Sequence, residues 1–580
     1  MIVFGLLHIA ISSLLAYAFA FAIGQLNIWV ALTSLILSVV MSWMLLDYKS
    51  NDFMNLQVGA WRNSFTGTIE KVVFVLIAMV GLRHFLFLFY QVDGEFRSLH
   101  PFNLGDLPLH IHYIRNLAAG VEFPPRNPNF STEILRYPFG IDLYNALWEC
   151  LGAVTSGHLF LVGFFSSIAA LVSLRLAGSW VAMVAFFFSG GYLAIANGGS
   201  QAVQNALAWK NLFLAMFITQ RGFLFALPSG VLIIYYLLLN ARRKPEIKLH
   251  PRTLIILGIL WGSLAFFHLH SFFILSFMIF ISAVYRALSD KMKGPQLIQN
   301  LRRLSRLWMM PLVIGSYFVL ISLNHFKTAS VLNWRFGWTI EPGQNILSYL
   351  TINFGSYLLL VLGIGYYLLQ HRLRNLYFEF VMNLTLFILF FNLMLAPWSW
   401  DNIKILVWPY LALLFLAYEV LRRDWENWVQ IVLLISLSYG GVYALSSSQF
   451  SVAEHVEIYT NFELANARGA TQGLPVNAIF ASSTTYNHEL TALGRNRAMG
   501  YEGHLWGHGI SFASTKQKLL VLMTGEERWL EAAHELKVNY IYWGPKEKLE
   551  FKSSAKEPPV WLAQLRNVSR VKDYEVYEIP

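Results

Sequence analysis

This chain contains little cysteine and few charged residues. Its 580 residues include one cysteine, Cys150, so no disulfide can close within the chain, and cysteine usage gives no redox compartment. Charged residues make up 13% of the chain, against roughly 25% in soluble domains. This low share excludes an ordinary soluble protein, and the 56% of hydrophobic residues predicts a polytopic membrane protein.

The familiar motifs of nucleotide and hydrolase chemistry are also missing. The sequence has no Walker A loop, no GxSxG, no HExxH and no GxGxxG in a Rossmann pattern. No spacing of histidine, cysteine or acid is typical of a metal site, so we predict no metal ligands. No cofactor is assigned, and a divalent metal stays open although nothing in the sequence indicates one. The net charge of +10 comes from short loops between apolar segments, which argues against nucleic acid as a partner.

Apolar segments of membrane-spanning length fill most of the chain. A bilayer core of about 30 Å needs roughly 20 apolar residues in a helix, and this measure predicts about 13 transmembrane helices. The apolar start is counted among them, because it lacks the basic region and cleavage site of a signal peptide. The predicted spans cover residues 3–24, 27–47, 72–92, 158–175, 178–196, 221–240, 253–267, 270–287, 308–323, 345–369, 376–396, 403–421 and 428–447.

Lysine and arginine decide the predicted orientation, since cytoplasmic loops are enriched in both. The basic clusters lie at residues 242–252, 286–306, 372–374 and 422–423. They share one face if 253–287 is a helical hairpin that turns at Phe267-His268-Leu269-His270. We therefore predict an integral protein of the plasma (inner) membrane with a cytoplasmic N-terminus, an external loop at 93–157 and an extracytoplasmic C-terminal domain.

Composition divides the chain into three parts. Residues 1–71 hold two N-terminal transmembrane helices and a cytoplasmic loop, and residues 72–447 hold the main transmembrane core with loop 93–157. From residue 448 the charge rises and the apolar runs shorten to strand length, as in IFASS (479–483), NYIYWG (539–544) and KDYEVYEI (572–579). With a helical segment at 515–536, residues 448–580 are predicted to form a small α/β domain.

Loop 93–157 carries the strongest candidate for catalysis. In GDLPLHIHYIRNLAAG, Asp106 precedes a helix that Pro108 helps to start and Gly120 ends, with apolar residues at the spacing of a helix on the membrane surface. Asp106 is either a general base that takes a proton from an acceptor hydroxyl or only the N-cap of this helix, and the spacing favours neither. Asp93 and Glu95 are alternative bases, because they lie where the preceding span emerges.

Polar residues of the outer loops and the outer ends of the spans form the predicted substrate-binding set. Cations there are costly near hydrocarbon unless they are paired or functional, and phosphate is a natural counter-ion that arginine can hold through two hydrogen bonds. Anchoring to outer headgroups explains part of the set equally well. The set consists of His110, Arg136, Asp142, Lys210, Arg221, His268, His270, Arg335, Asp401 and Lys404.

Together these features resemble the GT-C superfamily of membrane glycosyltransferases. The likeness rests on the many spans, a long first external loop with an acid and a juxtamembrane helix, and an external C-terminal domain. Three segments are similar to large uncharacterised multi-pass members: WDNIK (400–404), GYEGHLWGHG (500–509) and NYIYWGPKEKLEF (539–551). The resemblance covers residue 72 to the C-terminus. The loop lacks the adjacent acidic pair of several branches, and the tail lacks a WWDYG-like motif, which argues against an oligosaccharyltransferase.

The resemblance implies an inverting transfer of a sugar from a polyprenyl-phosphate donor to an extracytoplasmic glycan, lipid or protein of the cell envelope. It also implies that Asp106 is the base and that the external cations hold the lipid phosphate. A transporter or flippase of a lipid-linked sugar is the alternative, because many spans and intramembrane charges suit transport equally well. The two similar halves common in transporters are not seen in the sequence.

Overall fold

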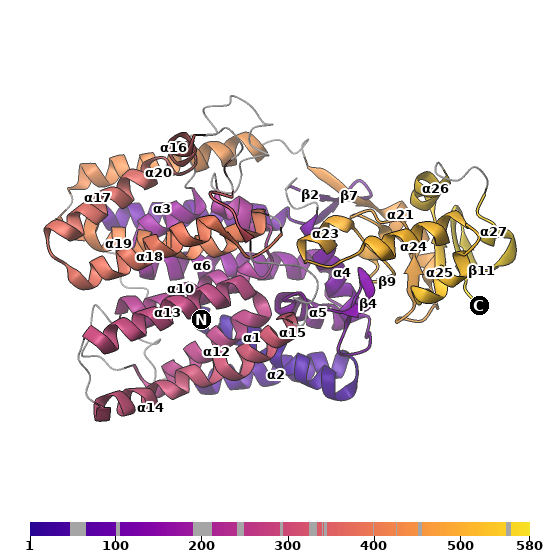
Figure 1. The fold of residues 1–580 in the computed structure, drawn as a ribbon, viewed down its shortest axis with the longest axis horizontal. Helices are drawn as coiled ribbons and strands as arrows, with labels where there is room; N and C mark the ends of the chain where they lie inside the picture. The colour runs from indigo at the N-terminus through magenta and orange to yellow at the C-terminus, as the bar shows by residue number, and fades with distance from the viewer. Residues whose placement is uncertain are drawn as a thin grey trace.

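The computed structural model shows a bundle of long apolar helices with an α/β domain packed against one end (Figure 1). It describes residues 1–46, 65–99, 105–188, 211–240, 249–289, 294–323, 333–338, 340, 345–397, 399–424, 426–449, 455–552 and 558–580. Lys210 and the basic cluster at 242–248 therefore lie outside the described residues.

The bundle consists of fourteen named α-helices in the described part of the chain. Their apolar sequences leave one face towards neighbouring helices and another towards lipid, except in α10 and α19, where nearly every residue is buried within the protein. The bounds are α1 Ile2–Ile23, α2 Ile28–Leu45, α3 Phe65–Leu86, α6 Thr155–Phe187, α10 Phe223–Ile234, α12 Pro251–Phe267, α13 Leu269–Ser289, α14 Gly294–Met310, α15 Ser316–Leu323, α16 Ile346–Phe354, α17 Ser356–Gln370, α18 Arg374–Asn392, α19 Ile403–Asp424 and α20 Asn427–Gln449.

The predicted number of membrane spans is not confirmed. Among the described residues, 7 helices are long and apolar enough to cross a membrane, or up to 8 if the bent pair α16–α17 counts as one span. That pair bends by 98° at Gly355. Helix α6 joins the expected spans 158–175 and 178–196 across a break at Gly178 and Ser179, whose backbone angles are not helical. The expected hairpin at 253–287 is present as α12 and α13, which are separated by His268.

The loop 93–157 folds into short elements at one end of the bundle. A hairpin of β1 (Tyr90–Val92) and β2 (Glu95–Ser98) is followed by α4 (Asp106–Ala118), by β3 (Arg126–Asn127) paired with β4 (Phe130–Ile134), and by α5 (Gly140–Cys150). The expectation of a helix on the membrane surface is wrong for α4. Almost all of its side chains are buried, because α4 lies between α5 and the C-terminal domain.

The C-terminal region has the predicted α/β character. A five-stranded sheet has the strand order β11 (Arg566–Val571), β12 (Tyr574–Glu578), β10 (Tyr540–Trp543), β8 (Ile479–Ala481) and β9 (Asn496–Arg497). Strand β7 (Val456–Thr460) instead pairs with β2 of the loop. The helices are α21 Asn461–Thr471, α22 Glu489–Ala492, α23 Glu502–Gly507, α24 Ala513–Thr524, α25 Trp529–Glu535, α26 Pro545–Lys552 and α27 Trp561–Gln564.

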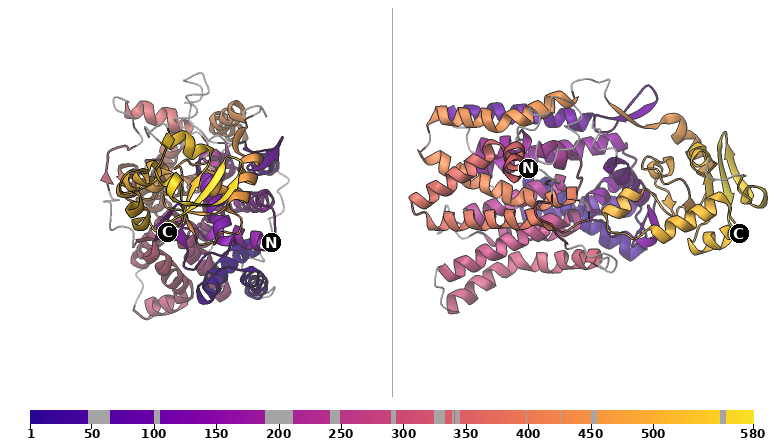
Figure 2. Two further views of the ribbon diagram at one scale, coloured as in Figure 1. Left: turned by 90° about the vertical axis from the view of Figure 1, so that its right-hand side faces the viewer. Right: turned by 45° about the horizontal axis from the view of Figure 1, so that its top comes forward.

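Buried hydrogen bonds fasten this domain to the loop 93–157. The Asn116 amide donates to the Gly494 carbonyl at 2.8 Å and to Asn496 Oδ1 at 2.9 Å. The Gly500 backbone N–H donates to the Asn129 carbonyl at 2.7 Å. Because buried polar groups are costly when they are left unpaired, these bonds favour the contact between the domain and the loop. The right-hand view of Figure 2 shows the domain at one end of the bundle.

Candidate active site

A polar cavity of about 240 Å³ lies where the helix bundle, the loop and the C-terminal domain meet. Its lining comes from the start of α4, the segment after β4, the break between α12 and α13, the residues on either side of the start of α19, and α23 with the residues after it. The polar and charged residues in this lining are Asp106, Asn127, Arg136, Tyr137, Gln220, His268, His270, Ser322, Asp401, Lys404, His504 and His508.

Asp106 faces this cavity as the first residue of α4. Gly105 occupies the N-cap position, and no side-chain hydrogen bond caps the helix, so the N-cap interpretation of Asp106 is wrong. The carboxylate Oδ2 instead accepts a hydrogen bond of 2.9 Å from the Gln220 amide. Burial raises the pKa of Asp106 above its ordinary value, and His110 and Lys404 oppose this rise.

Gln220 is brought to Asp106 by a close approach of two chain segments. The following Gly222 packs so tightly on the break between α12 and α13 that a Cβ atom there would lie 1.9 Å from the Phe267 carbonyl oxygen. Only glycine allows this approach. The contact therefore sets both Gln220 and His268 on the wall of the cavity.

An acid and a cation stand together at the start of α19. Lys404 Nζ lies 2.6 Å from Asp401 Oδ1, and both side chains are largely buried. Between them, the Asn402 side chain accepts a 3.0 Å hydrogen bond from the Ala396 backbone N–H and donates to the Ala396 carbonyl at 3.1 Å. These bonds fix the 395–397 wall against the helix start and hold the ion pair at the cavity.

Histidine and aromatic rings complete the lining. His504 and His508 lie one turn apart on α23 and the residue after it, and the His508 ring packs 4.7 Å from the Tyr137 ring. Burial lowers the pKa of His504 to about 3 and that of His508 to about 4, so both rings are neutral at pH 7. His268 and His270, from the junction of α12 and α13 in the bundle, also line the cavity.

The structure thus brings together Asp106, Arg136, Asp401, Lys404 and the two histidines of the α12–α13 break, although they lie far apart in sequence. Other predicted residues are beside the cavity rather than in its lining. His110 Nδ1 lies 2.9 Å from Asp142 Oδ1, so these two form a buried pair with each other behind Asp106.

The remaining predicted residues lie elsewhere. Arg221 is fully buried and does not line the cavity, and its guanidinium has no hydrogen-bond partner among the described residues; Asp142 interacts with it electrostatically. Although Arg221 and Lys404 both belong to the predicted substrate-binding set, they do not line one cavity. Asp93 and Glu95 belong to the β1–β2 hairpin, Arg335 is exposed, and Lys210 lies outside the described residues.

Six polar lining residues were not in the predicted set: Asn127, Tyr137, Gln220, Ser322, His504 and His508. The two C-terminal histidines had a detectable signal, since they stand at positions i and i+4 in GYEGHLWGHG and share one side of a helical turn. Gln220 had none, because its place depends on the contact that Gly222 makes with a distant segment.

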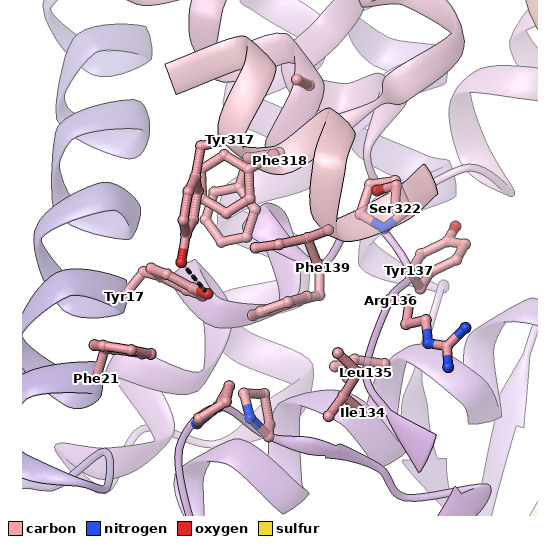
Figure 3. A pocket seen from close by; sticks show the side chains of 16 residues that line it. Tyr17, Phe21, Ile134, Leu135, Arg136, Tyr137, Phe139, Tyr317, Phe318 and Ser322 are labelled. Carbon is pink, nitrogen blue, oxygen red and sulfur yellow. Dashed lines mark hydrogen bonds between the residues drawn. The ribbon is translucent and has the colours of Figure 1, made fainter. Parts of the chain in front are cut away.

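An apolar groove of about 160 Å³ adjoins the cavity. Arg136, Tyr137 and Pro138 line both spaces, as do Ile134 and Ser322. Figure 3 shows aromatic rings along the groove, with Phe21 and Tyr17 of α1 at one side and Arg136 and Tyr137 at the other. The Tyr17 hydroxyl forms a 3.0 Å hydrogen bond with the Tyr317 hydroxyl, so α1 and α15 close this groove together.

A second cluster of ionisable groups lies inside the C-terminal domain. His488, Glu489 and Glu547 have ligand atoms close enough for a metal ion. These atoms already have partners: His488 Nε2 lies 2.6 Å from Glu547, which also accepts from the Ser483 and Gly544 backbones, and Glu489 is bound by Lys546 at 2.8 Å. The cluster is a satisfied polar network that joins β8 to α26, and it does not point to a metal.

No protein-family model matches this chain, and no curated protein sequence is significantly similar to it.

Proposed function

We propose that this protein is a membrane glycosyltransferase that moves a sugar from a polyprenyl-phosphate donor to an extracytoplasmic acceptor, with inversion at the anomeric carbon. One observation carries the proposal. The Asp106 carboxylate, held by Gln220, faces a cavity that also contains Lys404 and Arg136 and that continues into an apolar groove between membrane helices. A polar reaction space joined to such a groove fits an amphiphilic substrate.

In the proposed reaction, Asp106 takes the proton from the acceptor hydroxyl as its oxygen attacks the anomeric carbon. The bond between that carbon and the phosphate oxygen breaks, and the polyprenyl phosphate leaves with the electron pair. The raised pKa of Asp106 makes it a stronger base than an exposed carboxylate. Lys404 and Arg136 offset the charge that develops on the leaving phosphate.

The charges of the cavity suit this role. Asp401 balances Lys404 at 2.6 Å, and Glu133 balances Arg136 at 3.1 Å, so neither cation is left uncompensated before substrate binds. A bound lipid phosphate would contact Lys404 and Arg136 in addition to their carboxylate partners. The isoprenoid chain would occupy the adjoining groove, where Tyr17, Phe139 and Phe318 provide apolar surface.

The test is cleavage of a lipid-linked sugar by the purified protein in lipid nanodiscs. Undecaprenyl-phosphate and dolichyl-phosphate sugars are supplied as a panel of hexoses and pentoses, and release of the polyprenyl phosphate is followed by mass spectrometry. We expect Asp106→Asn to lower the rate by about 10² to 10⁴-fold, which is the range of general-base catalysis. Asn keeps the acceptor atom for Gln220, so the fold is retained.

Asp93→Asn is the matched control. Asp93 sits in a left-handed turn with φ of +51°, a conformation that Asn adopts as readily as Asp, and it lies in the β1–β2 hairpin. The Asp93→Asn protein should cleave the donor at the wild-type rate. Loss of activity in this variant, with normal activity in Asp106→Asn, would move the base to the hairpin. Movement of an intact lipid-linked sugar across the bilayer, without cleavage of any donor, would instead support the transporter.

A further inference from the structure

The proton on the His268 ring can be assigned from its neighbours. The Trp408 indole N–H donates to Ser271 Oγ at 2.8 Å. The Ser271 hydroxyl, 2.7 Å away, and the Ser271 backbone N–H, 3.3 Å away, are then both directed at His268 Nδ1 as donors. Because Nδ1 accepts, the neutral ring carries its proton on Nε2. That Nε2–H is buried and has no partner among the residues that the structure describes.

The proton on His504 is assigned in the same way. Here the unpartnered nitrogen is an acceptor, whereas that of His268 is a donor. His504 Nε2 lies 2.9 Å from the Gly105 carbonyl oxygen, which can only accept, so Nε2 carries the proton. Nδ1 is left with a lone pair. In the described part of the chain this atom is buried and unpartnered as well.

The two unpaired atoms belong to histidines that line the same cavity. His268 comes from the bundle and His504 from the C-terminal domain, and both line the space beside Asp106. One offers a hydrogen-bond donor and the other an acceptor. A buried polar atom without a partner is unfavourable, so a ligand that satisfies both atoms is favoured.

We propose that His268 and His504 together bind the hydroxyl groups of a neutral saccharide, with His268 Nε2 donating to a hydroxyl oxygen and His504 Nδ1 accepting a hydroxyl proton. The identification of the ligand as a saccharide rests on the proposed function. The C-terminal domain then supplies half of the sugar-binding site, and α23 is its recognition element.

The chemistry of the pair disfavours an ionised phosphate and a metal ion as its ligand. A phosphate oxygen has no proton to give to His504 Nδ1 unless it is protonated, and a metal ion cannot accept the N–H of His268. A hydroxyl both donates and accepts, as does the water that it displaces, so a sugar replaces water here without loss of hydrogen bonds. Burial holds the pKa of His504 at about 3, which keeps its lone pair free at pH 7.

Asn and Gln substitutions separate the two nitrogens of each ring. The amide of Asn reaches the position of Nδ1, and the amide of Gln reaches that of Nε2. His504→Gln should therefore keep the bond to Gly105 but lose the proposed sugar contact, and His504→Asn should do the reverse. For His268 the pattern is opposite: His268→Asn keeps the Ser271 contact and loses the sugar contact, whereas His268→Gln keeps the sugar contact.

Binding is measured on the full chain in nanodiscs, free of sugar-headed detergent. Saturation-transfer NMR reports methyl glycosides of glucose, galactose, mannose and arabinose as free saccharides. Thermal stabilisation by undecaprenyl-phosphate mannose, relative to undecaprenyl phosphate alone, reports the sugar of a donor. We expect affinity in at least one arm to fall about tenfold in His504→Gln and His268→Asn and to be kept in His504→Asn and His268→Gln. His534→Gln, at an exposed histidine, is the control.

A response in the NMR measurement would identify the bound hydroxyls as those of an acceptor saccharide, and a response in the thermal measurement would identify them as those of the donor sugar. The reverse pattern, with His504→Asn and His268→Gln as the weak binders, would mean that both histidines are structural and would overturn the proposal. So would saccharide binding in neither arm. The binding measurement needs no turnover, so this inference and the proposed transferase can fail separately. Saccharide binding with the expected variant pattern but no donor cleavage would keep this inference and reject the transferase. Donor cleavage without that variant pattern would keep the transferase and reject this inference.

Discussion

Asp106 illustrates how one residue trades stability for chemistry. Its side chain is half-buried, is raised in pKa by nearby Asp401 as well as by burial, and accepts a hydrogen bond from Gln220. A carboxyl group whose pKa is raised by folding prefers to be protonated in the folded state. It contributes most to stability below its ordinary pKa, and that contribution is lost as the pH rises through the raised value.

We therefore expect Asp106→Asn, although much slower in donor cleavage, to be more stable than the wild type at pH 7. The amide is neutral at every pH and still accepts from Gln220, so the cost of a buried charge disappears. Thermal unfolding of both proteins between pH 4 and pH 8 measures the difference, which should grow with pH and then level off. The wild-type rate of donor cleavage should fall on acidification through the same pKa. An Asn variant that is less stable than the wild type at pH 7 would contradict this account.

At the scale of elements, the cavity depends on how closely two chain segments approach. Gly222 allows the segment before α10 to touch the Phe267 carbonyl. We expect Gly222→Ala to destabilise the protein by about 1–3 kcal/mol, the usual cost of overpacking, and to reduce activity by displacing Gln220 and His268. Gly363→Ala in α17 is the matched control, because its added methyl group meets no atom within 4 Å. Thermal unfolding and donor cleavage are measured for both variants. Equal stability and equal activity of the two variants would show that the close contact of Gly222 does not shape the cavity.

The same scale explains what the sequence could and could not predict. Apolar runs and Pro and Gly signals placed α4, α12, α13 and the strands β8, β10 and β12 close to their observed positions, because these depend on local pattern. Asp106, Asp401 and Lys404 could be proposed as site residues because charge is rare in this chain. The role of His504 could not be predicted, since it arises only when the C-terminal domain packs on α4 and its ring reaches the Gly105 carbonyl.

Across the whole molecule, three helices have the cavity near one end and an arginine, Arg286, Arg374 or Arg422, near the other. Helix α13 begins beside His268 and His270 and carries Arg286 in its last turn; α19 begins at the Asp401–Lys404 pair and ends near Arg422. Helix α18 runs the other way, from Arg374 towards the cavity wall. Each has 19–22 residues and so extends about 30 Å, the thickness of a bilayer core.

This arrangement yields a topology prediction. If arginine-rich helix ends face the cytoplasm, the cavity and the C-terminal domain face outward. We expect a reporter inserted after Arg372, in the turn between α17 and α18, to give a cytoplasmic signal, and one fused after Pro580 to give an external signal. Figure 1 shows this turn at the end of the bundle away from the α/β domain. Paired alkaline phosphatase and fluorescent-protein fusions measure both sites. If both reporters gave a cytoplasmic signal, the C-terminal domain would lie on the same side of the membrane as the arginine-bearing helix ends. A donor sugar on the outer leaflet could then not reach Asp106.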